Sequence, residues 1–178
     1  MSAEKLVLLY SGGLDTSVLL KWFVEKGYDV YAYCGNVGQR EDWDELEKKA
    51  YASGAKGFLA GDLREMFAKD YVFPAVGYYA KYESRYMLGT SLARPAIIEG
   101  MVDYCSNIGA TTFAHGATGK GNDQVRFELA AASLMPDLKI IAPWRDAEFR
   151  AEFPGRTEMI EYAEKHNIPV KATKSKPW

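Results

Sequence analysis

The feature that most constrains the fold is an alternation of short apolar runs with segments of helical periodicity. The run 5–10 is almost continuously apolar, which is typical of a strand buried on both faces of a parallel sheet. After it, apolar side chains recur at helical spacing as far as Gly27, which predicts a helix that ends there. Because this alternation is repeated along the chain, the sequence predicts an α/β fold with a mostly parallel sheet of about five strands and helices on both faces.

Further elements follow from the same patterns. We expect strands at 29–34, 56–60, 111–115 and 138–142, with a sixth, shorter strand at 168–170. Helices are predicted at 41–53, from 63 to a break near Pro74, from a first turn at Pro95 onward, and at 122–134. The segment 75–93 has little periodicity, and we interpret it as a functional connection. We expect one domain over residues 1–178.

Composition argues against several classes of protein. A net charge of −2 is not typical of a general nucleic-acid binder. No stretch approaches the roughly 20 apolar residues of a membrane span, and no secretory signal precedes the first strand. The two cysteines, Cys34 and Cys105, are consistent with small core residues in a reducing cytoplasm. We therefore expect a cytoplasmic protein that is neither a general nucleic-acid binder nor a membrane protein.

The segment Ser11-Gly-Gly-Leu-Asp-Thr-Ser17 joins the first expected strand to the first expected helix. Its two adjacent glycines allow the backbone to approach an anion closely, and the amides at the helix N-terminus attract negative charge. Ser11, Thr16 and Ser17 add hydroxyl donors, while Asp15 can either cap the helix or hold Mg²⁺. A plain strand–helix turn is the alternative interpretation. The spacing matches neither a Walker A loop nor a dinucleotide fingerprint, yet it predicts a phosphate-binding loop.

A second polar loop follows the fourth expected strand and occupies residues 115–127. Arg126 can form a two-pronged bond to a carboxylate, and Asp123 can bind an ammonium group. Alternatively, Asn122 or Asp123 caps the helix that follows. A single histidine such as His115 is more often structural than catalytic. Taken together, these residue types are suited to binding the charged groups of an amino acid.

The first loop resembles the Ser-Gly-Gly-x-Asp-Thr signature of the ATP pyrophosphatase (PP-loop) enzymes. The segments 82–95, 116–127 and 143–145 are similar to those of argininosuccinate synthases. The resemblance implies a Rossmann-like, three-layer α/β/α fold of the adenine nucleotide alpha hydrolase kind. It also implies a C–N ligase that uses ATP with Mg²⁺ to join citrulline and aspartate, releasing AMP and pyrophosphate. Full-length members of the family form homotetramers.

The same resemblance implies three sets of binding residues and leaves the catalytic residue unassigned. Mg²⁺ is expected to be carried by ATP rather than by a protein site. Two residues depart from the family pattern, because Leu9 replaces a small residue and Gly35 replaces alanine. The ATP set comprises Leu9, Tyr10, Ser11, Gly12, Gly13, Leu14, Asp15, Thr16, Ser17, Gly35, Ala114, His115, Gly116, Ala117, Thr118, Gly119, Lys120, Gly121 and Asn122. The citrulline set comprises Tyr86, Ser91, Asn122 and Arg126, and the aspartate set comprises Thr118, Asn122 and Asp123.

Family members carry a long second domain beyond the region that resembles this chain. We therefore expect residues 1–178 to be the nucleotide-binding domain, which binds ATP but has little or no turnover alone. Two other functions stay open. One is a different PP-loop enzyme that amidates a substrate or thiolates tRNA, and the other is a non-catalytic ATP-binding module.

Overall fold

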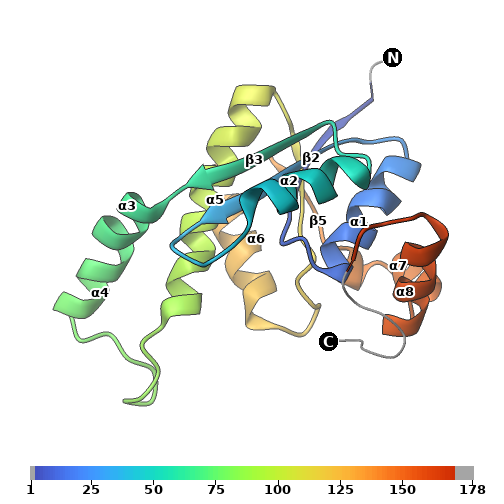
Figure 1. The fold of residues 1–178 in the computed structure, drawn as a ribbon. Helices are drawn as coiled ribbons and strands as arrows, with labels where there is room; N and C mark the ends of the chain where they lie inside the picture. Colours follow the sequence, from blue (N-terminus) through green and yellow to red (C-terminus); the bar gives the residue numbers. More distant parts are fainter. Residues whose placement is uncertain (1–2, 171–178) are drawn as a thin grey trace.

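The computed structural model describes residues 3–170 and contains a five-stranded sheet (Figure 1). The strands lie in the order β3-β2-β1-β4-β5, and every neighbouring pair is parallel. The expected parallel α/β fold is therefore confirmed, while both ends of the expected domain lie outside the described residues. The strands are β1 (Lys5–Leu9), β2 (Asp29–Asn36), β3 (Gly57–Asp62), β4 (Thr112–Ala114) and β5 (Lys139–Ile141).

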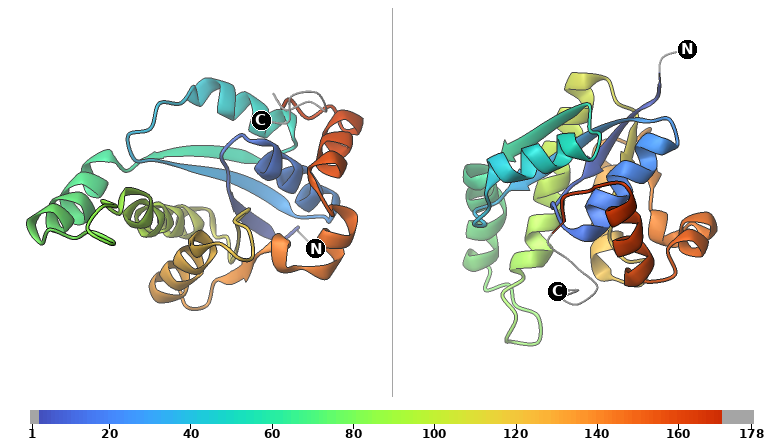
Figure 2. Two further views of the ribbon diagram at one scale, coloured as in Figure 1. Left: turned by 90° about the horizontal axis from the view of Figure 1, so that it is seen from below. Right: turned by 45° about the vertical axis from the view of Figure 1, so that its right-hand side comes forward.

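Helices cover both faces of the sheet and produce the expected three layers (Figure 2). One face carries α1 (Leu14–Glu25) and α2 (Trp43–Ala52), with α8 (Arg156–Lys165) packed beside α1. The opposite face carries α5 (Gly89–Ile108) and α6 (Asn122–Leu134), which pack against each other. The short helix α7 (Ala147–Glu152) follows a 3-10 turn, η2 (Pro143–Arg145).

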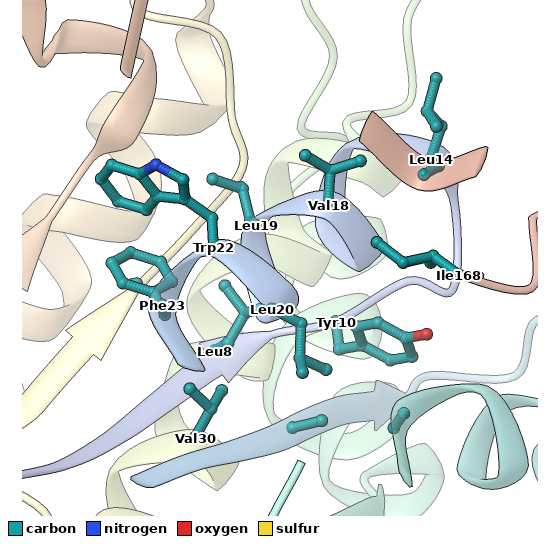
Figure 3. Packing of buried hydrophobic residues seen from close by; sticks show 14 of the residues in the cluster. Leu8, Tyr10, Leu14, Val18, Leu19, Leu20, Trp22, Phe23, Val30 and Ile168 are labelled. Atoms are coloured by element: carbon teal, nitrogen blue, oxygen red, sulfur yellow. The ribbon is translucent and has the colours of Figure 1, made fainter. Parts of the chain in front are cut away.

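Strand β1 divides the hydrophobic core into two clusters. Leu6 and Leu8 are fully buried in the cluster on the α1 face, whereas Val7 and Leu9 belong to the cluster on the α5 face. Figure 3 shows the first cluster, in which Leu20 of α1 lies near Leu8 of β1 and Val30 of β2. Burying a leucine or valine side chain completely contributes about 1.5–3 kcal/mol. Apolar residues at consecutive positions thus fix β1 at the centre of the molecule.

The expected break near Pro74 is wrong. Helical structure continues from α3 (Arg64–Met66) through a π-helical turn, η1 (Phe67–Val72), into α4 (Phe73–Gly77). Pro74 lies in the first turn of α4, where its missing N–H is tolerated. The helical segment from α3 to α4 projects from the end of β3 (Figure 1). Of the segment 75–93, which was expected to be irregular, only residues 78–88 lack regular structure.

Two further expectations are wrong. Helix α5 begins at Gly89, so Pro95 lies in its interior rather than in its first turn. Since proline has no N–H, the carbonyl of Ser91 loses its usual donor within the helix. The sixth strand is also absent from the described residues, because residues 168–170 make no strand pairing. Instead, Ile168 packs into the core beneath α1, which explains its apolar character (Figure 3).

In the part of the chain from 3 to 170, no helix has the length and apolar character needed to cross a membrane.

Candidate functional site at the carboxyl ends of β1 and β4

The first predicted loop connects the buried end of β1 to α1. Gly12 has a φ of +69°, which side chains larger than hydrogen adopt only with strain. A Cβ atom at Gly12 would also overlap Leu46 of α2. Gly13 is the N-cap of α1, and no described side chain caps this helix end. The N-terminus of α1 therefore has no side-chain cap, and the predicted binding of an anion by its first-turn amides stays a prediction.

The hydroxyl groups of the loop have two different environments. The Ser11 hydroxyl lies 3.2 Å from that of Thr16, and both residues lie at the surface of the loop. The Ser17 hydroxyl is buried and lies 3.1 Å from the Tyr10 hydroxyl. Ser11 and Thr16 thus present their hydroxyls at the surface, while Ser17 and Tyr10 form a buried contact beneath the loop.

Asp15 is not the helix cap, because that position belongs to Gly13. It lies in the first turn of α1, where burial raises the pKa of its carboxyl and the nearby Arg156 guanidinium partly opposes this rise. A group of three or more His, Cys, Asp or Glu residues that could hold a metal ion does not occur within residues 3–170.

Two cavities meet at Ser11, which lines both of them. The larger cavity, of about 600 Å³, lies on the α2 side and is bounded by Ser11, Gly12, Gly13 and Leu14 together with charged residues. The smaller one, of about 310 Å³, lies between the ends of β1, β2 and β4. Its wall includes the predicted residues Leu9, Tyr10, Thr16, Gly35, His115, Gly116, Ala117 and Asp123, along with Tyr33, Cys34, Gln39, Arg94, Ile97 and Phe127.

Gly35 fits the smaller cavity closely. A Cβ atom at this position would lie 2.8 Å from Ile97 Cγ1, so an alanine would require the Ile97 side chain of α5 to move. Leu9 lines the same cavity with little exposed surface. Leu9 and Gly35, the two positions expected from the resemblance to depart from the family pattern, therefore line the same cavity.

The second predicted loop leaves the end of β4 and returns at α6. Gly121 is the N-cap of α6, so neither Asn122 nor Asp123 caps the helix with its side chain. A cavity of about 450 Å³ is lined by Gly116, Ala117, Thr118, Gly121, Asn122 and Asp123. The structure thus brings the predicted aspartate-binding residues Thr118, Asn122 and Asp123 to one hollow.

Asp123 lies between two guanidinium groups. Arg94 of α5 donates to its Oδ2 at 2.9 Å, and Arg126 donates to its Oδ1 at 2.9 Å. Burial would raise the pKa of Asp123, but the two guanidinium groups hold it below its ordinary value. The sequence predicts a binding role for Arg126 but gives no sign of Arg94, because the pairing of Arg94 in α5 with Asp123 in α6 depends on how the two helices pack.

His115 anchors the second loop. Its Nδ1 accepts a hydrogen bond from the Ala117 amide at 3.3 Å, so its Nε2 is the atom that donates to Glu128, also at 3.3 Å. Burial is the main cause of the lowered pKa of His115, although Glu128 acts in the opposite direction. Glu128 in turn pairs with Arg145 at 3.0 Å. These contacts favour a structural role for His115 over a catalytic one.

Tyr86 and Ser91 lie apart from the two cavities at Ser11, since neither residue lines them. The Tyr86 hydroxyl accepts a hydrogen bond from the Thr90 amide at 3.1 Å, at the start of α5. Of the predicted citrulline set, only Asn122 and Arg126 lie on α6. None of the three cavities described here has Tyr86, Ser91 or Arg126 in its wall, and the four-residue citrulline set stays a prediction.

A five-stranded parallel sheet with a glycine-bearing loop at the N-terminus of α1 defines a HUP-type α/β domain. The model for the "Arginosuccinate synthase N-terminal HUP domain" matches residues 5–169. The chain belongs to the argininosuccinate synthase family.

Relatives named argininosuccinate synthase come from distant organisms. The one from Thermotoga petrophila is 55% identical over 175 residues, which cover 98% of this chain and 43% of the relative. The Drosophila melanogaster protein is 53% identical over 178 residues, covering 100% of this chain and 42% of the relative. The chain therefore spans less than half the length of these relatives.

Among solved structures, a predicted subunit of a tRNA methyltransferase from Methanocaldococcus jannaschii has a similar fold. Its TM-score is 0.54 at 12% sequence identity, and the match covers 92% of this chain and 88% of the other. At this identity the likeness concerns the fold alone.

Proposed function

We propose that residues 11–17 bind the triphosphate of ATP through the backbone amides at the start of α1. The observation that carries this proposal is the conformation of Gly12, whose positive φ disfavours a side chain and where an added Cβ atom would displace the Leu46 side chain. The smaller cavity beside Leu9 and Gly35 is the proposed place for the adenine base, because it is the more apolar of the two cavities that meet at Ser11.

The proposed reaction of the longer enzyme is the ligation of citrulline and aspartate. The ureido oxygen of citrulline attacks the α-phosphorus of ATP, and pyrophosphate leaves with the electron pair of the broken bond. The amine of aspartate then attacks the ureido carbon, loses a proton and displaces AMP, which yields argininosuccinate. Bound with ATP, Mg²⁺ would screen the phosphate charges, and Asp15 in the first turn of α1 is one carboxylate that could contact it.

The second loop is the proposed site of the two amino acids. Arg126 can hold the carboxylate of citrulline, and Asp123 can hold the ammonium group of aspartate. Support comes from the way Thr118, Asn122 and Asp123 surround one hollow beside Ala117. Positioning and charge stabilisation supply most of the catalysis in such a reaction, so no nucleophilic side chain is required.

We propose that the 178-residue chain binds ATP with little turnover of its own. Membership of the argininosuccinate synthase family argues against the alternative of a tRNA-thiolating enzyme. Two free, buried cysteines fit a reducing compartment, and the cytoplasm is the proposed location. The homotetramer stays a prediction for the full-length family.

The test is calorimetric titration of the chain with Mg-ATP and then with citrulline. Saturable ATP binding is expected, and its absence would refute the proposed role of residues 11–17. In the full-length protein, exchange of labelled pyrophosphate into ATP should require citrulline. Exchange that proceeds equally well without citrulline would contradict the proposed substrate.

A further inference from the structure

The loop after β2 is held by side chains of its own residues. Gln39 spans the turn with both polar atoms of its carboxamide. Its Oε1 accepts a hydrogen bond from the Val37 amide at 2.9 Å, and its Nε2 donates to the carbonyl of Gly35 at 2.9 Å. Asn36 adds a second contact, because its Oδ1 accepts from the amide of Gly38 at 3.0 Å. The chain between β2 and α2 therefore begins with a tight turn, in which Gly38 has a φ of +108°.

These contacts fix which way the Gln39 carboxamide faces. If the group were flipped, its oxygen would meet the Gly35 carbonyl and its NH₂ group would meet the Val37 amide. Both hydrogen bonds would then be lost, and like groups would face each other. A carboxamide has two N–H donors and an oxygen with two lone pairs. Gln39 therefore retains one donor and one acceptor for a ligand, in an order that the turn determines.

Gln39 also lines the smaller cavity at Ser11, which is the proposed place for the adenine base. Other polar side chains of that wall have partners within the protein. The pairs are Arg94 with Asp123, His115 with Glu128 and Ala117, Tyr10 with Ser17, and Ser11 with Thr16. The Tyr33 hydroxyl has no hydrogen-bond partner among the described residues, but it is buried next to Gly61 and Gly100. Gln39 is thus the side chain of this wall best placed to contact the edge of a base.

We infer that Gln39 selects adenine over purines that have an oxygen at position 6. The inference rests on the proposed function, in which the base enters this cavity. A glutamine amide recognises adenine by accepting from its 6-amino group and donating to the neighbouring ring nitrogen. Hypoxanthine and guanine have a carbonyl oxygen in place of that amino group, so the Gln39 oxygen would face a second acceptor. A freely rotating carboxamide could turn its NH₂ group toward that oxygen, but the bonds to Gly35 and Val37 oppose the turn.

The test compares the affinities of ATP and of inosine triphosphate, each with Mg²⁺, by calorimetry on the 178-residue chain. The two nucleotides have the same ribose and triphosphate, so the ratio of their affinities reports on the base alone. The original chain is expected to prefer ATP by at least about tenfold. Gln39→Met has a side chain of similar length without the hydrogen bonds, and its preference for ATP should fall below about threefold.

Asn36→Ala is the matched control. It removes the other side-chain bond of the same turn, and Asn36 lies outside the cavity wall. Any loss of affinity in this variant should be equal for the two nucleotides, so the preference for ATP should stay as in the original chain. An equal fall of the preference in Asn36→Ala and Gln39→Met would mean that the order of the loop, rather than the Gln39 carboxamide, selects the base. That result would overturn the inference.

The original chain separates a failure of the inference from a failure of the proposed function. If it binds neither nucleotide, the proposed function fails and the inference fails with it. If it binds ATP and inosine triphosphate equally, or if Gln39→Met keeps the original preference, the inference fails while ATP binding stands. Should Gln39→Met not fold, as judged by circular dichroism, Gln39→Ala decides the outcome by the same ratio.

Discussion

The two loops of the candidate site are held in place by different means. The loop after β1 is fixed locally, by the backbone of Gly12, by the paired hydroxyls of Ser11 and Thr16, and by the buried Tyr10–Ser17 contact. The loop after β4 depends on side chains that lie outside the loop, in α5 and α6. Its anchors are the pairs of Asp123 with Arg94 and of His115 with Glu128.

This difference shows what each loop demands of the sequence. A loop whose shape comes from glycines and a helix start can be identified from a few consecutive residues. A loop that is oriented by ion pairs across α5, α6 and η2 takes its final geometry only when those elements have packed. The first loop should therefore tolerate very few substitutions, while the second should respond to changes far from it.

The largest effect is expected from Gly12→Ala. The added methyl group would require both a strained φ and displacement of Leu46, and it would stand between the backbone and the phosphates. We expect the affinity for ATP to fall by at least about thirtyfold, or about 2 kcal/mol, in calorimetric titrations.

Gly27→Ala is the matched control for this change. Gly27 also has a positive φ, of +88°, and a Cβ atom there would have open space around it. It lies at the opposite end of α1, so the variant should carry a similar backbone cost with normal ATP affinity. Equal losses of affinity in the two variants would mean that general destabilisation, rather than the phosphate loop, explains the effect.

A smaller effect is expected from Asp123→Asn, which tests the dependence of the second loop on distant pairs. The change weakens the contacts with both Arg94 and Arg126, whose side chains are about one-third exposed. After allowance for solvent screening, we expect a loss of about 1 kcal/mol in the free energy of unfolding. Urea denaturation measures it, with the exposed Asp137→Asn as the control. If Asp123→Asn lowered ATP affinity more than Gly12→Ala does, the proposed difference between the two loops would be contradicted.

The pH dependence of stability tests the buried anchor of the second loop. Because burial lowers the folded-state pKa of His115 below its ordinary value of 6.5, protonation favours the unfolded chain. The contribution of His115 to stability should decline as the pH falls below about 6.5. In His115→Asn, the free energy of unfolding should therefore change less between pH 7.5 and pH 5.5. Parallel pH profiles of the variant and the original chain would contradict the prediction.

The smallest effect on stability is expected from Lys120→Met. Lys120 lies at the exposed tip of the second loop, away from both of its anchors. The free energy of unfolding should change by less than about 0.5 kcal/mol, as is usual for exposed positions. A larger loss in urea denaturation would mean that the tip itself stabilises the fold.

Much of the fold follows from periodicity, as the five strands and the three layers illustrate. Errors occur where tertiary packing outweighs local signals. Pro74 fits within the first turn of a helix, and Pro95 lies inside a long helix that begins with Gly89 and buries Ala96 and Ile98. The apolar segment 168–170 after α8 is predicted to be a strand, yet Ile168 packs into the core cluster beneath α1 and its segment pairs with no strand of the sheet.

The candidate site divides in the same way. The position of Gly12, Gly13 and Thr16 at a helix start could be predicted from consecutive residues. Arg94 and Arg156 could not be predicted, because no local pattern brings an arginine of α5 to Asp123 or one of α8 to Asp15. The neighbours of these residues are set by helix packing.

The strand order also bears on how the chain emerges during synthesis. Leu6 pairs with Val30, a near neighbour in sequence, but its other partner is Thr112, which is made much later. Pairing over such a distance carries a high entropic cost and is slow. On the ribosome, the first loop and its helix can therefore form before β4 and the second loop have been synthesised. Until β4 is inserted, an exposed edge of β1 is open to incorrect partners, and a chaperone that shields this edge would protect the nascent domain.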